Sequence, residues 1–419
     1  MVLSERISGL APFIIIGWRN MWRQKRRSLV VISSIAIGIS AMIMLTGFMN
    51  GLTQQMVDNT INTALGHVTL HRKGFRNNIK LEKSFLPGPD VYAALEREGS
   101  LRAWAPRVTI KGMIRSGEGS RGVLIQGIDP AREKGVSKLY DYMLKKEGRF
   151  LSGPAADELL ISKSLAEKLD VYLDDRVVLM FQDAGNEVVG AGLRVAGFFE
   201  TPMGGFDRGV VFVGIDRLRA LCGIGPAVSE IVMSTRDLNA VEVTGGRLSA
   251  AIHDPALEVQ TWKEMAPDLV SAITLQETMM FVIFMIVFIT VIFSIANTLI
   301  MSIIERFHEL GVMKSIGTRP SRVFFIVMYE AMSLGLLGLV LGMLVSVPVV
   351  LVLGHTGMDF SFALESMRKW GTGNIIYPVL ATRDIVSAAF IVFFTTFVAA
   401  LYPALKAARI KPLDALNYV

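Results

Sequence analysis

The chain has 419 residues, of which 52% are hydrophobic and 19% charged, and its formal net charge is +6. This apolar share exceeds that of an average soluble protein, and it is concentrated in four stretches almost free of charge: 28–57, 278–304, 323–353 and 385–405. Every basic cluster adjoins one of these stretches, which argues against a nucleic-acid partner. The single cysteine, Cys222, excludes an internal disulfide, and we interpret it as a small core residue.

The N-terminal segment 1–27 holds six basic residues and one acid. Within it, the aromatic and aliphatic residues of 10–27 share one face of a helix, which predicts an interfacial helix on the membrane surface. A positively charged flank with aromatic belt residues is the alternative, and both interpretations are compatible. The apolar stretch that follows is longer than a signal-peptide core and has no convincing cleavage site, so we expect a retained anchor.

Four transmembrane helices are predicted because each apolar stretch supplies the roughly 20 residues that cross a ~30 Å hydrocarbon core. Their expected bounds are 28–50, 276–304, 322–353 and 383–405. Lysine and arginine in short flanking segments favour the cytoplasmic side. The segments predicted to be cytoplasmic on this ground are 1–27, 305–321 and 406–419. The segments left outside are 51–275 and 354–382.

The large insertion 51–275 alternates short apolar strands with fewer helices, which predicts a mixed α+β domain and not a βαβ series. The expected strands are 66–71, 106–114, 121–128, 175–181, 192–199 and 209–215. The expected helices are 162–170, 216–223, 238–252 and 262–275, the last continuing into the second span. We expect two lobes, one built from both ends of the insertion and the other mainly from 115–215.

Motifs for catalysis are missing from the sequence. It has no phosphate-binding glycine loop, no H-E-x-x-H, no Cys/His cluster and no G-x-S-x-G. We interpret the isolated His67 as a structural residue. The chain is therefore predicted to be non-catalytic and to bind no metal or cofactor, so any energy would come from another polypeptide.

Several residues stand out within the spans. Three glycines in the third span are spaced for close helix packing: Gly335, Gly338 and Gly342. They favour internal packing and a dimer contact equally. Asn297 is expected to donate an interhelical hydrogen bond, and Glu330 to pair with Arg322 or with another helix. A bundle of four spans is thin for a solute pore, which favours partnership with a second copy or a related chain.

The segment ERFHELGVMKSIG (305–317) joins the second and third spans and has helical periodicity. Leu310 belongs to its apolar face, and Gly317 is a plausible C-terminal stop. A short helix joined directly to two spans would act as a lever, since force applied to it moves both. A solvated connector explains the spacing equally well.

The chain also resembles the FtsX-like permeases, the membrane subunits of the LolC/LolE and MacB branch of ABC transporters. The most specific motifs are ERFHELGVMKSIGTRPSRVFFIVMYEAMSLGLLGLVLG (305–342) and YPALKAARIKPLDALNY (402–418). The segment 17–40 also fits the start of this family, and looser similarity lies in 157–181, 193–218 and 257–269. The resemblance covers nearly the whole chain and implies one span, a periplasmic domain and three further spans in a bacterial inner membrane.

This resemblance implies that 305–317 is a coupling helix that docks on a separate cytoplasmic ABC ATPase. By motif match, with Leu310 added from the apolar face, the coupling positions would be Glu305, Arg306, Glu309, Leu310, Gly311, Lys314 and Gly317. Because only 27 residues precede the first span, separate subunits are expected, as in LolC and LolE. Two ATPase copies would bind ATP and magnesium, beside a second permease subunit, the same or related, and membrane lipids.

The expected cargo is a lipoprotein passed toward the outer membrane, and this expectation depends on the family alone. One alternative is export of small molecules or peptides with a periplasmic adaptor. Another is regulation of a periplasmic cell-wall hydrolase. A plain structural scaffold is a weaker alternative, because it gives no reason for a coupling motif.

Overall fold

A computed structural model describes residues 22–23, 25–369 and 371–411. Residues 10–21 and 24 of the predicted interfacial helix 10–27, and residues 412–419 of the tail 406–419, lie outside these residues. The described chain forms two compact units. We call the first the helical unit; it holds the residues up to Leu52, Thr274–Met358 and the residues from Ile376 onward. The second, the mixed unit, holds Thr53–Ile273 and Asp359–Ile375.

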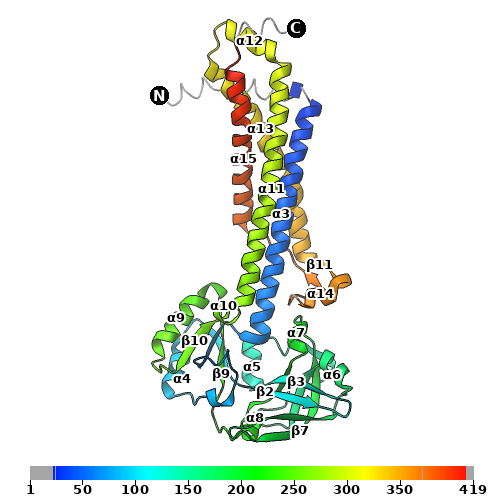
Figure 1. Cartoon of the computed structure of the whole chain (residues 1–419), viewed down its shortest axis with the longest axis vertical. Coiled ribbons are helices and arrows are strands. Elements are labelled where there is room, and N and C mark those ends of the chain that lie inside the picture. Colours follow the sequence, from blue (N-terminus) through cyan, green and yellow to red (C-terminus); the bar gives the residue numbers. More distant parts are fainter. Residues whose placement is uncertain (1–21, 24, 370, 412–419) are drawn as a thin grey trace. The chain divides into compact units, whose positions relative to one another are not determined.

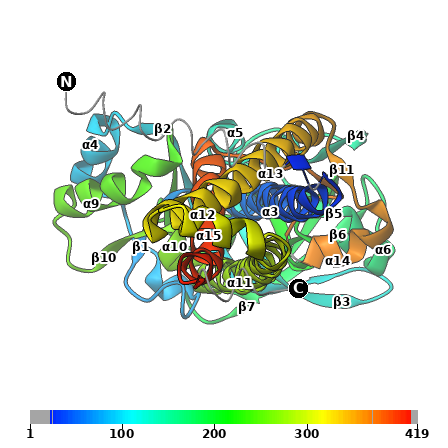
Figure 2. The same ribbon diagram turned by 90° about the horizontal axis from the view of Figure 1, so that it is seen from above.

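The helical unit is built on four long helices that run side by side (Figures 1 and 2). They are α3 (Lys25–Thr60), α11 (Pro267–Glu305), α13 (Pro320–Thr356) and α15 (Thr382–Ala408). Each is long and apolar enough to cross a membrane, which confirms the fold class with four spans. The 39 residues of α11 extend for about 58 Å at 1.5 Å per residue, well beyond a ~30 Å hydrocarbon core. Residues 53–60 of α3 and 267–273 of α11 belong to the mixed unit.

Close contacts at glycines bring these helices together. A Cβ atom on Gly338 would lie 2.6 Å from the Cβ of Ile35, and one on Gly342 would lie 2.9 Å from the carbonyl oxygen of Ala36, both in α3. A Cβ on Gly335 would lie 2.6 Å from Thr396 Oγ1 in α15. The glycines of the third span therefore pack inside one chain, against the first and fourth spans.

Short elements join the long helices. They are α12 (Phe307–Ser315), β11 (Met358–Asp359), the 3₁₀ helix η4 (Ser361–Ala363), α14 (Leu364–Lys369) and β12 (Ile375–Ile376), whereas the π-helix η1 (Ile61–Leu65) follows α3 and leads to the first strand of the mixed unit.

The mixed unit contains one ten-stranded sheet with the order β10-β1-β9-β2-β3-β8-β5-β7-β4, and β6 pairs with both β2 and β7. The strands are β1 (Val68–Arg72), β2 (Leu101–Arg115), β3 (Ser120–Ile128), β4 (Met143–Gly148), β5 (Glu158–Ser162), β6 (Arg176–Gln182), β7 (Val188–Phe199), β8 (Val210–Gly214), β9 (Glu230–Thr235) and β10 (Leu257–Thr261). The pairings of β2, β3, β8, β5, β7 and β6 close on themselves, and we call these six strands the strand ring.

Helices surround the sheet. They are η2 (Leu81–Lys83), α4 (Pro89–Arg97), α5 (Pro130–Val136), α6 (Lys163–Leu169), α7 (Gly204–Asp207), α8 (Ile215–Cys222), η3 (Leu238–Ala240), α9 (Val241–Ala251) and α10 (Trp262–Met265). All six ring strands contribute to one buried core, which α6 and α8 complete. A separate core draws its residues from 57–101 and 228–273. Along β5, Leu159 and Ile161 join the ring core, whereas Leu160 packs with Phe199 and Phe212 on the other face, as period-2 alternation requires.

Candidate coupling site

The segment between the second and third spans, residues 305–317, which we call the coupling segment, is a bent element and not one continuous helix. Glu305 is the last residue of α11, Arg306 leaves helical geometry with φ −105° and ψ 15°, and α12 starts at Phe307. Figure 1 shows α12 at the end of the bundle where α3 starts and α15 ends. The coupling segment and the described parts of both chain ends therefore lie at the same end of the helical unit.

Gly317 ends α12, as its position in the sequence predicts. Its φ of +96° lies in the left-handed region that favours glycine. The amide of Thr318 donates to the carbonyl of Met313 at 3.0 Å, and that of Gly317 donates to Lys314 at 3.1 Å. These two bonds form a Schellman motif, and Pro320 then opens α13 at its first turn.

Two arginines near the start of the first span form ion pairs with the coupling segment. Arg27 donates two hydrogen bonds to the carboxylate of Glu305, at 2.7 and 2.5 Å. Arg23 Nη2 lies 2.7 Å from Glu309 Oε1. Burial raises the pKa of Glu309, but the hydrogen bonds and charges of Arg23 and Arg306 outweigh this effect, so the pKa is lowered overall.

Arg306 connects the bend to the third span. Its Nη1 lies 3.1 Å from Glu330 Oε2, and its Nε lies 3.4 Å from Glu309 Oε2. Ser302 Oγ is 3.5 Å from the other carboxylate oxygen of Glu330, whose residue is only 6% exposed. The structure thus assigns Arg306, and not Arg322, as the partner of Glu330, and it satisfies an acid that would be costly alone at this depth.

Lys314 joins α12 to the end of the fourth span. Its Nζ donates to the carbonyl oxygens of Ala408 at 2.9 Å and Ile410 at 2.5 Å. The last carbonyls of a helix have no partner within the helix, so a lysine at this position satisfies them. The four charged residues predicted to contact an ATPase, Glu305, Arg306, Glu309 and Lys314, all make contacts inside the chain.

Of the remaining predicted positions, Leu310 and Gly311 are buried and Gly317 is exposed. Leu310 and Gly311 are covered by the helical core, and Phe307 and Met313 pack partly against it. Val312, by contrast, is 38% exposed, and Ile316 is 78% exposed. His308, Val312 and Ser315 are exposed with helical spacing along one side of α12, and its C-cap residue Ile316 is exposed beside them; we call these four residues the outer stripe.

Sequence reasoning did not identify this stripe. Ile316 follows Val312 by four residues, and that spacing was the available signal.

Asn297 lies on an exposed side of α11. Within residues 25–369 and 371–411, its side chain has no hydrogen-bond partner, so the expected interhelical bond is not made inside this part of the chain. The described residues also contain no group of three or more His, Cys, Asp or Glu placed to hold a metal ion.

Known proteins match the chain over most of its length. Residues 28–251 match the MacB-like periplasmic core domain, and residues 280–412 match the FtsX-like permease C-terminal region. The lipoprotein-releasing system transmembrane protein LolC of Neisseria meningitidis is 24% identical over 96% of this chain and 98% of its own length.

Two further relatives are proteins other than LolC. The lipoprotein-releasing system transmembrane protein LolE of Haemophilus influenzae is 19% identical over 97% of this chain and 99% of its own length. The macrolide export ATP-binding/permease protein MacB of Acinetobacter baylyi is 23% identical over 99% of this chain but only 60% of its own length. The chain therefore belongs to the family of permeases that combine a MacB-like periplasmic core domain with an FtsX-like C-terminal region.

Proposed function

We propose that this permease transmits motion from a separate ABC ATPase to its periplasmic domain, and that the motion releases lipoproteins from the inner membrane. Two ATPase copies would bind ATP and magnesium and dock on the coupling segment. The chain itself would supply no catalytic group. A second permease subunit, the same or related, would complete the pair of coupling segments that two ATPase copies require.

The observation that carries this proposal is that the coupling segment is exposed on one side and bonded to the spans on the other. Its outer stripe is exposed, with an apolar pair at Val312 and Ile316 that suits burial in a protein groove. The bend before α12 is fixed to two spans through Arg27–Glu305 and Arg306–Glu330, and α12 itself is fixed to a third through Lys314–Ala408. A displacement of α12 would therefore reach α3, α13 and α15 together. A solvated connector would need neither feature.

The orientation follows from charge. Lysines and arginines gather at the end of the helical unit that holds α12, the start of α3 and the end of α15. The positive-inside rule assigns that end to the cytoplasm and the mixed unit to the periplasm. Both assignments agree with an ATPase on the inner side and a cargo on the outer side.

Lipoproteins are the proposed cargo because LolC and LolE are similar along almost their full length. Export of small molecules or peptides with a periplasmic adaptor is the second candidate, favoured by the match to MacB over 99% of this chain. The two candidates share the coupling segment and differ in what leaves the membrane.

The test replaces an exposed residue of the outer stripe. Ile316→Asp should weaken co-purification with the ATPase subunit by at least about tenfold, the equivalent of about 1.4 kcal/mol, because a charge would be buried without a partner. Leu86→Asp, which makes the same change at a residue 68% exposed in the mixed unit, is the matched control and should bind the ATPase normally.

Release is then measured from proteoliposomes that contain the complex and an acylated lipoprotein. Ile316→Asp should abolish release that depends on ATP, whereas Leu86→Asp should retain it. Normal ATPase binding and release by Ile316→Asp would contradict the coupling role. Release of a drug or peptide but of no lipoprotein would favour the second candidate.

A further inference from the structure

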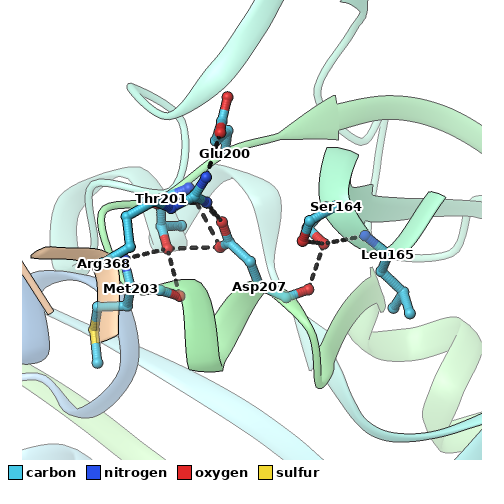
Figure 3. Close-up of polar contacts among 8 residues, drawn as sticks. Ser164, Leu165, Glu200, Thr201, Met203, Asp207 and Arg368 are labelled. Atoms are coloured by element: carbon cyan, nitrogen blue, oxygen red, sulfur yellow. Dashed lines mark hydrogen bonds and ion pairs between the residues drawn. The ribbon is translucent and has the colours of Figure 1, made fainter. Parts of the chain in front are cut away.

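The loop between the third and fourth spans is bound to the strand ring by one arginine. Arg368, in α14, donates from Nη1 to Glu200 Oε1 at 2.6 Å and from Nη2 to Asp207 Oδ2 at 2.6 Å (Figure 3). Its Nη2 also lies 3.2 Å from the carbonyl oxygen of Thr201. One guanidinium group thus contacts two carboxylates and a backbone carbonyl on the segment that follows β7.

Asp207 is the deeper of the two acids. Its side chain is 1% exposed, whereas that of Glu200 is 44% exposed. The amide of Thr201 donates to both oxygens of Asp207, at 3.2 and 3.0 Å, and Thr201 Oγ1 donates to Oδ1 at 2.6 Å. A carboxylate buried this far needs a compensating charge, and Arg368 provides it.

The contact continues into the ring. The hydroxyl of Ser162, the last residue of β5, donates to the carbonyl oxygen of Asp207 and accepts from the amide of Leu165 at 3.2 Å, which caps α6. The segment that Arg368 holds is therefore bonded to β5 and continuous with β7. Both strands belong to the strand ring.

The same loop is also bonded to the outer part of the first long helix. Asn59 Nδ2 donates to the carbonyl of Gly371 at 2.9 Å, and Gln55 Nε2 donates to that of Ile375 at 2.9 Å. Residues 359–375 thus belong by contact to the mixed unit, although the chain enters them from α13 and leaves them into α15.

We propose that residues 359–375 form a strut, in which Arg368 is the positioning residue that keeps the loop locked on the strand ring throughout the transport cycle. The strut carries the displacement of α13 and α15 to the ring, beside the routes through α3 and α11. The source of that displacement is the ATPase motion of the proposed function. The lock stays closed because opening it would leave the buried carboxylate of Asp207 without its cation.

A reversible covalent bond tests this directly. A Cβ atom on Gly204 would lie 3.4 Å from the Cβ of Arg368, close to the ~3.5–4.5 Å separation found across disulfides. The double variant Gly204→Cys/Arg368→Cys is made in the full-length chain with Cys222→Ala, so the engineered pair supplies all the thiols. The Arg368→Cys substitution removes the guanidinium, so the loop is unlocked when the two thiols are reduced, and oxidation to the disulfide locks it again.

The strut predicts three results. The disulfide forms both in the permease alone and in its ATP-bound complex. The reduced variant binds the ATPase subunit, and the complex hydrolyses ATP normally but releases lipoprotein at least about fivefold more slowly, since a coupling contact is lost. Oxidation restores release. Gly204→Cys alone, which keeps Arg368, is the matched control and should release lipoprotein at the normal rate in either redox state.

Other outcomes overturn the proposal. An active reduced form with an inactive oxidised form would mean that the loop must open during the cycle. Equal release by both forms would remove any transmitting role, and absence of the disulfide would remove the contact itself.

A measurement that needs no cargo distinguishes a failure of this proposal from a failure of the proposed function. In the permease alone, amides of 201–209 should exchange hydrogen faster in Arg368→Ala than in the unsubstituted chain, and at the original rate in the oxidised double variant. If the unsubstituted complex released no lipoprotein, the proposed function would fail while this exchange pattern still tested the lock. Unchanged exchange in Arg368→Ala would overturn the lock alone.

Discussion

His67 shows how a single buried side chain makes stability depend on pH. The residue is 9% exposed, and its Nδ1 accepts a hydrogen bond from the amide of Thr235 at 2.9 Å. Thr235 Oγ1 lies 2.6 Å from the same nitrogen. Burial, and then the charge of Arg102, lower the pKa of His67, so the folded chain holds it neutral.

The free energy of unfolding should therefore fall as the pH decreases from about 6.5 through the lowered pKa of His67. The unfolded chain takes up the proton first, so acid favours unfolding. Urea denaturation of the detergent-solubilised protein at pH 7.5 and 5.0 measures this change. His67→Asn should reduce the difference between the two pH values, and His253→Asn, at an exposed position, should leave it unchanged. An equal difference in His67→Asn would contradict the assignment.

Arg107 and Glu133 form an ion pair in which each side chain is 1% exposed. Arg107 Nη2 is 2.5 Å from Glu133 Oε1, and Nη1 donates to the carbonyl of Ala64 in η1 at 3.0 Å. The pair thus connects β2 and α5 to the end of the helix that begins in the membrane. Removal of Glu133 alone would leave the buried cation of Arg107 without its ion-pair partner.

Glu133→Ala should lower the free energy of unfolding by about 3–5 kcal/mol, the usual effect of breaking a buried pair on one side. Replacing both partners with apolar residues, as in Arg107→Met/Glu133→Leu, should cost less than Glu133→Ala alone. Denaturant titration of the full chain compares the variants. Equal losses for the single and the double variant would show that packing, and not charge, sets the effect.

At the scale of the elements, features that depend on neighbouring residues could be predicted from the sequence, whereas contacts between distant residues could not. The stop at Gly317 and the apolar side of 305–317 were predictable, because helix periodicity and a C-terminal glycine act within a few residues. The partners of the charged residues were not, because Arg27 and Glu305 are 278 positions apart. Strands β5 and β9 were not identified either, since their short runs are buried on both faces and do not alternate.

The third span offers a clean comparison of helix contacts. Gly338→Ala should lower the stability of the detergent-solubilised protein by about 1–3 kcal/mol, because the new methyl group would lie 2.6 Å from Ile35. Gly38→Ala makes the same change in the first span, where the nearest atoms, on Val287 and Val291, are 3.6 Å away. That control should be neutral or should stabilise the helix by up to about 1 kcal/mol. Equal thermal midpoints in both variants would contradict the close α3–α13 contact.

At the scale of the whole molecule, the number of spans and the fold class were predictable, because apolar length and strand alternation are properties of the sequence itself. The closure of the strand ring was not. It depends on β2 pairing with β3 along one side and with β6 along the other, and nothing in either strand specifies a second partner. The contact of Arg368 with Asp207 was equally invisible, since both lie in connecting segments 161 residues apart.

The orientation is testable by thiol labelling, because the native cysteine gives little background. Cys222 is buried, and burial raises the pKa of its thiol to about 12. In spheroplasts, an impermeant maleimide should label Glu118→Cys, an exposed residue of the mixed unit, and should label Ile316→Cys only after permeabilisation. Labelling of Ile316→Cys in sealed cells would reverse the proposed topology.

The closed strand ring has a mechanical consequence. Each of its six strands is flanked on both sides by hydrogen-bonded neighbours, so none offers a free edge for another chain to extend. A pull on one strand is opposed by two ladders at once and is shared around the circle. A force applied at the end of β7 should therefore move the whole strand ring as a rigid body instead of peeling away a single hairpin.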